Sequence, residues 1–260
     1  MNFIELILNE YELFLLVFVR MTGIFIITPI FSRKNIPAIL KISMSFVMAL
    51  IVFNVLSFNP VNLNNDLGIF IILIKELSIG LLIGFVSYLF FISLFIAGQL
   101  IDTQIGFGMV NLFDPQNNSQ VPITGNLYYI LALLIFLNID GHHWFIQAIF
   151  KSYETVPLGH FAINNNMVNQ MISIFSQIFV IGFKVSSPVL ATVFLTNVLL
   201  GILAKTMPQM NVFVVGMPLK ILVGIFTIFI TMPIYLIALQ HIFDDMYGEI
   251  FNFLKILQKG

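Results

Sequence analysis

The stretch Thr103–Asn126 reads TQIGFGMVNLFDPQNNSQVPITGN and lies between two long runs of apolar residues. In its first half glycines alternate with large apolar side chains, whereas the second half, Asp114–Pro122, is polar and contains two prolines. Glycine allows backbone conformations that other residues avoid, and proline interrupts helix and strand alike. At membrane depth such a segment is tolerated only where it is buried in protein or lines a cavity. In a membrane protein, this pattern predicts a stopper for a pore.

The composition indicates that the chain is an integral membrane protein. Of its 260 residues, 59% are hydrophobic and 9% are charged, and the mean hydropathy is +1.03. A soluble domain is about half apolar and about a quarter charged. Cysteine is absent, which excludes disulfides and thiolate chemistry, and no basic cluster indicates binding to nucleic acid. Because Glu5, Glu10 and Glu12 stand near the N-terminus, we expect no cleavable signal peptide there.

Six runs of the chain approach or exceed the roughly 20 apolar residues that a helix needs to cross a bilayer. They are Leu13–Phe31, Leu40–Phe58, Leu67–Leu100, Leu127–Ile149, Met171–Ala204 and Val212–Leu239. The fourth run is interrupted by Asp140-Gly141-His142-His143. These runs predict an all-α membrane protein with about six long helices, several of them kinked. The third and fifth runs are too long for one bilayer unless they are strongly tilted or partly outside it.

We expect a single domain over residues 1–260. Within it, residues 1–170 hold the first four helices and residues 171–242 form a last helical hairpin. The tail, residues 243–260, places apolar residues at helical spacing with acidic residues between them, which predicts a short amphipathic helix.

Charged residues recur in or beside the apolar runs, and the set is Arg20, Lys75, Glu76, Asp102 and Lys184. A charge at the bilayer centre costs about 3 kcal/mol or more, so Arg20 should face water or a partner. We favour a structural ion pair with a carboxylate such as Glu76 or Asp102 over a role in transport. Lys75 and Glu76 are neighbours and cannot pair face to face on a helix. A proton relay needs further carboxylates or histidines in other runs, and none is evident, so assembly contacts are preferred.

Two short motifs carry weaker signals. Gly80 and Gly84 form a small-xxx-small pattern, which lets another helix approach closely. His142 and His143 follow Gly141, and adjacent histidines bind a metal only if other ligands converge on them. A capped turn at a helix end is the preferred interpretation. No arrangement of nucleophile and base is visible, and no nucleotide motif is complete, so we expect neither enzyme activity nor a cofactor or metal.

The connection Leu203–Lys220 reads LAKTMPQMNVFVVGMPLK. Lysine and arginine are more numerous in the odd-numbered loops, which places this connection in the cytoplasm. Its methionines offer an adaptable apolar surface. The residues fit a rigid hairpin turn and a docking surface for a partner equally well. The candidate docking residues are Lys205, Pro208, Met210, Pro218 and Lys220.

Several segments together resemble the FliR/SctT family of type III export-gate proteins, which has flagellar and injectisome members. The segments are Leu203–Gly224, Asp114–Asn126, Gly141–Trp144 with Ser152–Gly159, and Phe18–Ser32. The resemblance covers essentially the whole chain, although Asp140 stands where relatives commonly have an uncharged polar residue. It implies a fold similar to a fusion of two smaller companion subunits, P-type and Q-type, with much of it raised out of the bilayer plane. It also implies a closed gate in the bacterial inner membrane, at the flagellar basal body.

The resemblance assigns a role to the segment Thr103–Asn126. The family's lumen is blocked by a glycine-rich apolar loop, which corresponds to residues 105–122 here. The implied plug residues are Gly106, Phe107, Gly108, Met109, Val110, Leu112 and Phe113. The implied partners are the P-type and Q-type companions and the B-type switch subunit, with exported flagellar proteins as transient clients. Nucleic acid is not an expected partner, and the chain is not expected to form a homo-oligomer by itself.

Other classes of protein remain open at this point. The chain fits an injectisome-type member of the same family as well as a flagellar one. A secondary transporter for a small solute would use Arg20, Lys75 and Asp102 near the midplane, with alternating access between its halves. A transporter should be stable alone, whereas a gate subunit should need its companions. An intramembrane enzyme lacks paired catalytic residues.

Overall fold

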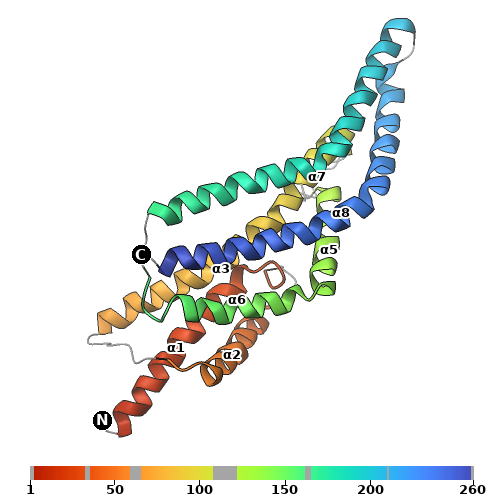
Figure 1. The fold of residues 1–260 in the computed structure, drawn as a ribbon. Helices are drawn as coiled ribbons and strands as arrows, with labels where there is room; N and C mark the ends of the chain where they lie inside the picture. Colours follow the sequence, from red (N-terminus) through yellow and green to blue (C-terminus); the bar gives the residue numbers. More distant parts are fainter. Residues whose placement is uncertain are drawn as a thin grey trace. The chain divides into compact units, whose positions relative to one another are not determined.

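The structure is a computed structural model that describes residues 3–32, 36–58, 66–107, 122–161, 165–209 and 211–258. Within these ranges the secondary structure is helical and contains no strand. The helices, labelled in Figure 1, are α1 (Phe3–Ile27), α2 (Ala38–Val55), α3 (Asp66–Ile105), α5 (Ile123–Asn138), α6 (Gly141–Thr155), α7 (Asn165–Thr206) and α8 (Val212–Gln258). The all-helical class predicted from the apolar runs is confirmed.

The break expected at Asp140–His143 in the fourth run is confirmed, whereas the sixth run ends later than predicted. The fourth run is divided at Ile139 and Asp140, and Asp140 has a left-handed backbone with φ 57°. The sixth run and the tail form one continuous helix of 47 residues, α8, rather than a span followed by a separate amphipathic helix. The segment Leu239–Phe243 contains neither glycine nor proline, so nothing in it ends the helix.

Four helices of the described chain are long and apolar enough to cross a membrane: α2, α3, α7 and α8. The number rises to five if the bent pair α5 and α6 is counted as one span. The helix α1 falls outside this set because each of its 18-residue stretches contains Glu10, Glu12 and Arg20. The expected count of about six was therefore approximate. The helices α3 and α7 have 40 and 42 residues, which confirms that they exceed the roughly 20 residues of one bilayer crossing.

The chain divides into two compact units. Unit 1 comprises residues 1–89, 140–174 and 245–260, and unit 2 comprises residues 90–139 and 175–244. The long helices α3, α7 and α8 each contribute to both units.

Unit 1 is held together by close helix packing and by phenylalanine rings. A Cβ added to Gly80 of α3 would lie 2.2 Å from the carbonyl oxygen of Arg20 on α1, and one added to Gly84 would lie 3.0 Å from that of Ile24. The two helices therefore touch backbone to backbone, as the small-xxx-small pattern predicted. Between α1 and α2, the Phe14 ring packs edge-on against Phe46, with ring centres 5.6 Å apart.

Unit 2 is built around aromatic contacts and the α7–α8 hairpin, which we define as residues 175–206 and 212–244. Figure 1 shows the two arms of this hairpin running side by side, and Thr227 on α8 donates a hydrogen bond to Thr192 on α7 at 3.1 Å. Tyr128 of α5 stacks on Tyr235 of α8, with ring centres 4.2 Å apart. The Tyr235 hydroxyl also donates to the Tyr128 carbonyl oxygen at 2.8 Å, so this contact is both apolar and hydrogen-bonded.

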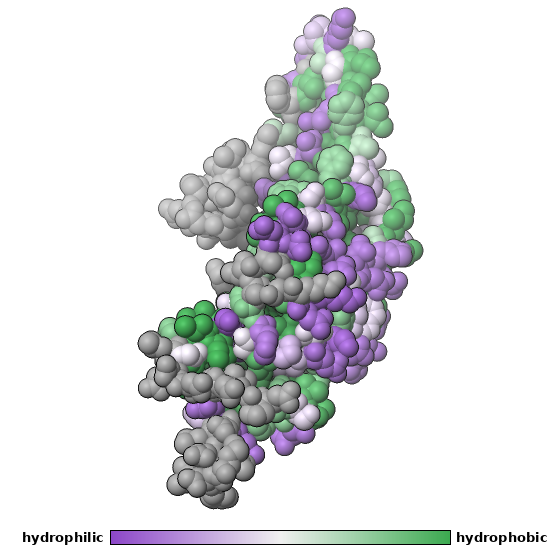
Figure 2. All heavy atoms as spheres, turned by 60° about the vertical axis from the view of Figure 1, so that its left-hand side comes forward, coloured by the Kyte–Doolittle hydropathy of each residue, from purple (hydrophilic) through white to green (hydrophobic). Residues whose placement is uncertain are grey.

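The α7–α8 hairpin exposes a large apolar surface. Figure 2 shows apolar residues along the hairpin toward the top of the view, with polar residues at its end. Many large side chains on it are at least 60% exposed, and they include Phe179, Phe183, Phe194, Leu195, Leu199, Leu222, Phe226, Phe229 and Ile234. An apolar surface of this extent is covered by lipid or by other protein chains.

Replacing Gly80 with alanine should destabilise unit 1. The new methyl group would collide with the Arg20 carbonyl oxygen, a backbone atom that cannot move without shifting α1. Overpacking of this kind costs about 1–3 kcal/mol, so we expect a lower thermal unfolding midpoint for the detergent-solubilised protein.

The matched control for this substitution is Gly68→Ala on the same helix, since a Cβ there has no heavy atom within 4 Å. Equal unfolding midpoints for the two variants would show that the α1–α3 contact does not have the tightness described.

Candidate functional site

The two ends of the segment Thr103–Asn126 are held together in unit 2, and we call this contact region the base of the segment. The helix α3 ends at Ile105 and is followed by Gly106, whose φ of +99° favours glycine. The helix α5 begins at Ile123, directly after Pro122, which has no side-chain group to cap it. The buried carboxylate of Asp102 accepts hydrogen bonds from the Thr124 amide, at 3.2 and 3.3 Å, and from the Thr124 hydroxyl.

Asp102 therefore supplies the cap that α5 lacks. The first amides of a helix have no partner within the helix, and the positive end of the helix dipole favours a carboxylate. Helix caps usually come from the residue just before the helix, whereas this one comes from the end of α3, across residues 103–121. The Asp102–Thr124 contact thus fixes the start of α5 against the end of α3.

Close backbone packing reinforces this base. A Cβ added to Gly98 would lie 2.1 Å from the Gly125 Cα, so α3 and α5 touch without side chains between them. The Ile105 side chain meets α8 at Gly224, where an added Cβ would come within 2.4 Å of it. Three helices of unit 2 therefore converge where α3 ends.

Of the seven residues predicted to plug a lumen, the structure describes two. Gly106 and Phe107 continue from the end of α3 and are both partly buried. Gly108, Met109, Val110, Leu112 and Phe113 lie outside the described residues.

The buried polar centre of unit 1 is built around Arg20. Its guanidinium is fully buried and its Nε lies 2.6 Å from the Glu76 Oε2. The remaining nitrogens donate to the carbonyl oxygens of Ser152 and Val156, each at 3.0 Å. The same guanidinium carbon lies 4.3 Å from the centre of the Tyr153 ring, a cation–π contact.

Glu76 has a second partner, since its Oε1 accepts a hydrogen bond from the Gly159 amide at 2.8 Å. The sequence left Glu76 and Asp102 open as partners of Arg20, and the structure pairs Arg20 with Glu76. The carbonyls of Ser152 and Val156 lie at the C-terminus of α6, and that of Ser152 also accepts a hydrogen bond from the Val156 amide at 2.9 Å. The cation therefore also caps α6, a contact that the sequence did not indicate because nothing in it joins residues 20 and 152.

The other predicted charges do not converge with Arg20. Lys75 is partly buried and forms no ion pair with any residue that the structure describes. Lys184 is exposed on α7. Of the candidate docking residues, Lys205, Pro208 and Pro218 are exposed, and Met210 lies outside the described residues.

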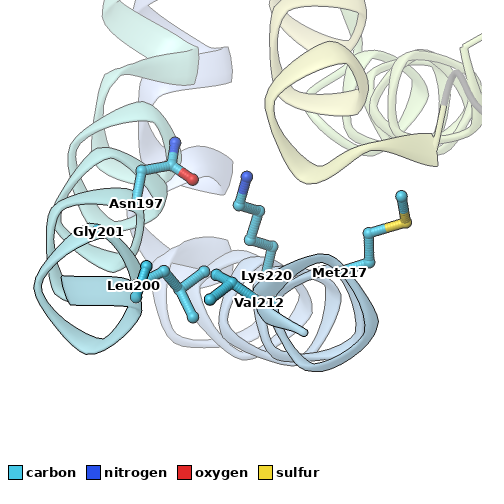
Figure 3. Close-up of a pocket in the computed structure, with 8 residues that line it drawn as sticks. Asn197, Leu200, Gly201, Val212, Met217 and Lys220 are labelled. Atoms are coloured by element: carbon cyan, nitrogen blue, oxygen red, sulfur yellow. The ribbon is translucent and has the colours of Figure 1, made fainter. Parts of the chain in front are cut away.

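Lys220 lines a small pocket between the arms of the α7–α8 hairpin. The pocket has a volume of about 200 Å³ and is bounded by residues of both helices: Asn197, Leu200, Gly201, Ala204, Val212, Gly216, Met217 and Lys220. Figure 3 shows the ammonium end of Lys220 and the carboxamide of Asn197 on the same side of it, whereas Met217 points away. Among the predicted docking residues that the structure describes, Lys220 alone lines this pocket together with residues of α7.

His142 and His143 lie in the first turn of α6. The residue before that helix, Asp140, makes no side-chain hydrogen bond that caps it. The turn therefore lacks the side-chain cap that the sequence favoured. The carboxylate of Asp140 instead lies near the imidazoles of His142 and His143.

These features define an all-helical membrane protein whose polar interactions fix its helices to one another. Residues 11–246 match the family model described as bacterial export proteins, family 1. The chain is 33% identical to the flagellar biosynthetic protein FliR of Bacillus subtilis, over 96% of this chain and 98% of that protein. It is 28% identical to FliR of Escherichia coli, over 90% and 88% of the two chains. It is also 30% identical to the Yop proteins translocation protein T of Yersinia pestis, over 83% and 84%. The chain belongs to this family of bacterial export proteins.

Replacing Arg20 with methionine should strongly destabilise unit 1. The substitution leaves the Glu76 carboxylate buried without its counter-charge and removes the Arg20 donors from the carbonyls of Ser152 and Val156. Breaking one side of a buried pair costs about 3–5 kcal/mol. We expect a marked fall in the thermal unfolding midpoint in detergent.

The control for Arg20→Met is Lys75→Met, which removes a cation next to Glu76 in sequence but outside the ion pair. The double variant Arg20→Met/Glu76→Met should recover part of the loss because no buried charge is left unpaired. An Arg20→Met variant as stable as Lys75→Met would contradict the structural role of the pair.

Thr124→Ala should weaken the base of residues 103–121. It removes the hydroxyl that donates to Asp102 and loosens the cap of α5, for which losses of about 0.5–2 kcal/mol are typical. The expected result is faster hydrogen exchange of the amides at the start of α5, measured by mass spectrometry.

The same substitution at Thr103 is the matched control, because the exposed Thr103 hydroxyl donates to the Gln99 carbonyl oxygen of its own helix and to no other residue that the structure describes. If both variants leave the exchange of α5 unchanged, Asp102 does not act as its cap.

Proposed function

We propose that this protein is a subunit of the flagellar type III export gate in the bacterial inner membrane, at the flagellar basal body. The observation that carries the proposal is the 33% identity to FliR of Bacillus subtilis over nearly the full length of both chains. The four to five apolar helices support a place in the membrane. The relative from Yersinia, named for Yop protein translocation, supports a type III system more generally. The flagellar system is preferred to an injectisome because of the higher identity to the Bacillus protein.

In this proposal the segment 105–122 is a hydrophobic plug. Apolar side chains that fill a lumen exclude water and ions, as hydrophobic constrictions do in channels. The ends of the segment are tied together by the contact between Asp102 and Thr124 and by the close packing of Gly98 on Gly125. A plug needs such a fixed base, because it must return to one position after a client has passed. The left-handed backbone at Gly106 lets the chain leave the axis of α3 there.

The proposed partners are the P-type and Q-type companion subunits and the B-type switch subunit, with unfolded flagellar proteins as clients. The exposed apolar surface of the α7–α8 hairpin supports an assembly with other membrane subunits. Lys205, Pro208, Met210, Pro218 and Lys220 would form a docking surface on the cytoplasmic side. The mechanism is gating and not catalysis, so the energy for export would be supplied by other components.

The double variant Phe107→Ala/Phe113→Ala should leak small ions through the assembled gate. Removing two large rings opens space in the proposed plug, while the helices of both units keep their contacts. Ion flux into liposomes that contain the purified gate complex measures the effect.

The control is Phe229→Ala, which removes a ring that is 77% exposed on α8, outside the segment. Native mass spectrometry of each tagged variant should show one copy of this chain with several copies of two smaller membrane proteins. A complete complex that stays ion-tight after the double substitution would remove the plug from the proposal. A stable monomer or homodimer instead of a complex would favour a small-solute transporter.

A further inference from the structure

Three potential metal ligands come together at the first turn of α6 in unit 1. The Asp140 Oδ1 lies 3.6 Å from the His143 Nδ1 and 4.0 Å from the His142 Nε2. The two imidazole rings lie face to face at a tilt of 36°, with centres 4.2 Å apart. One ligand atom from each of the three side chains lies within 4.8 Å of the other two.

The backbone places Asp140 where it can join the two histidines. Its left-handed conformation, with φ 57°, is uncommon for a residue with a side chain, although aspartate and asparagine tolerate it best. The His143 amide donates to the Asp140 carbonyl oxygen at 2.8 Å, which closes the turn. The carboxylate is thereby held beside the helix start. Two adjacent histidines alone do not make a metal site, and this turn supplies the additional ligand that they require.

The ligand atoms remain available for an ion. The distances from the Asp140 carboxylate to both imidazoles exceed those of hydrogen bonds. The His142 Nδ1 is buried and has no hydrogen-bond partner among the residues that the structure describes. The cluster does not use this nitrogen, because the Nε2 of the same ring is the atom that lies 4.0 Å from the Asp140 carboxylate. Asp140 and His143 have side chains that are 69% and 64% exposed, so an ion can reach the cluster from solvent.

We propose that Asp140, His142 and His143 bind a divalent transition-metal cation of the Zn²⁺ class. Imidazole nitrogen is a preferred ligand of Zn²⁺, Ni²⁺ and Cu²⁺, whereas Ca²⁺ and Mg²⁺ take oxygen ligands. Zinc holds nitrogen and carboxylate ligands at about 2.0–2.2 Å, which puts neighbouring ligand atoms about 3.5 Å apart. The separation between Asp140 and His143 already matches this geometry. The fourth position of a tetrahedral site stays open to water or to a group from a neighbouring chain.

The ion would lock the start of α6. It would join the residue just before the helix to its first turn and offset the left-handed backbone at Asp140. This proposal is independent of the proposed export function, because it rests only on the geometry of the turn.

The single tryptophan of the chain, Trp144, follows His143 and reports on the site directly. The full-length protein, purified in detergent without a histidine tag and treated with a chelator, is titrated with Ni²⁺, which quenches nearby tryptophan fluorescence. We expect saturable quenching with a stoichiometry of one ion per chain. Added Zn²⁺ should reverse it by competition at the same site.

Substitutions at the cluster separate this site from adventitious binding. The double variant His142→Ala/His143→Ala should lose saturable quenching. Asp140→Asn, which keeps a residue tolerant of the left-handed backbone, should weaken the affinity by at least about 10- to 100-fold, the loss typical of supporting residues at metal sites. The matched control is His241→Ala, which removes an exposed histidine outside the cluster and should leave the titration unchanged.

Two outcomes would overturn the proposal. One is a wild-type protein whose Trp144 fluorescence shows no saturable response to Ni²⁺. The other is a titration with the same midpoint in the wild type and in His142→Ala/His143→Ala. The emission maximum of Trp144 without metal checks that each variant keeps its fold at α6. If a variant fails this check, the Asp140→Asn titration decides, and an unchanged affinity in it excludes the carboxylate as a ligand.

Discussion

The guanidinium of Arg20 is fully buried in a chain that is mostly apolar, and unit 1 depends on how that charge is satisfied. A buried charge is tolerated only when it is paired and hydrogen-bonded. Arg20 on α1 meets this requirement through Glu76 on α3 and the carbonyls at the end of α6. Because Arg20 and these partners belong to three helices, the cost of leaving the charge unpaired selects one arrangement of those helices.

Asp102 solves a comparable problem in unit 2. The first amides of α5 follow Pro122, which offers them no side-chain acceptor, and the carboxylate from the end of α3 fills that role. Close glycine contacts accompany both polar centres, at Gly80 beside Arg20 and at Gly98 beside Thr124. Direct contact between backbones brings the helices close enough for the carboxylates of Glu76 and Asp102 to contact their partners on the neighbouring helix. Packing and polar satisfaction therefore support each other in each unit.

Sequence reasoning found the features that depend on local composition. The apolar runs predicted the long helices α3 and α7, and the Gly80–Gly84 pattern predicted a close helix contact that α1 provides. The spacing of Met246, Ile250 and Phe253 predicted an amphipathic helix, and all three residues are buried on α8. It was less accurate where a helix continues past the end of an apolar run. The sequence separated the sixth run from the tail, whereas α8 continues through residue 258 because no glycine or proline interrupts it between Leu239 and Phe243.

By itself, the sequence determined the class of the protein, because hydropathy and helix length are sums over neighbouring residues. It also identified which charges needed partners, since a buried charge is costly wherever it lies. Only the tertiary structure decided which partner each charge takes: Glu76 for Arg20 and Thr124 for Asp102. Likewise, a list of residues could not show that Asp140 turns its carboxylate toward His142 and His143. These choices depend on distances between side chains, and such distances are set only when the whole chain has folded.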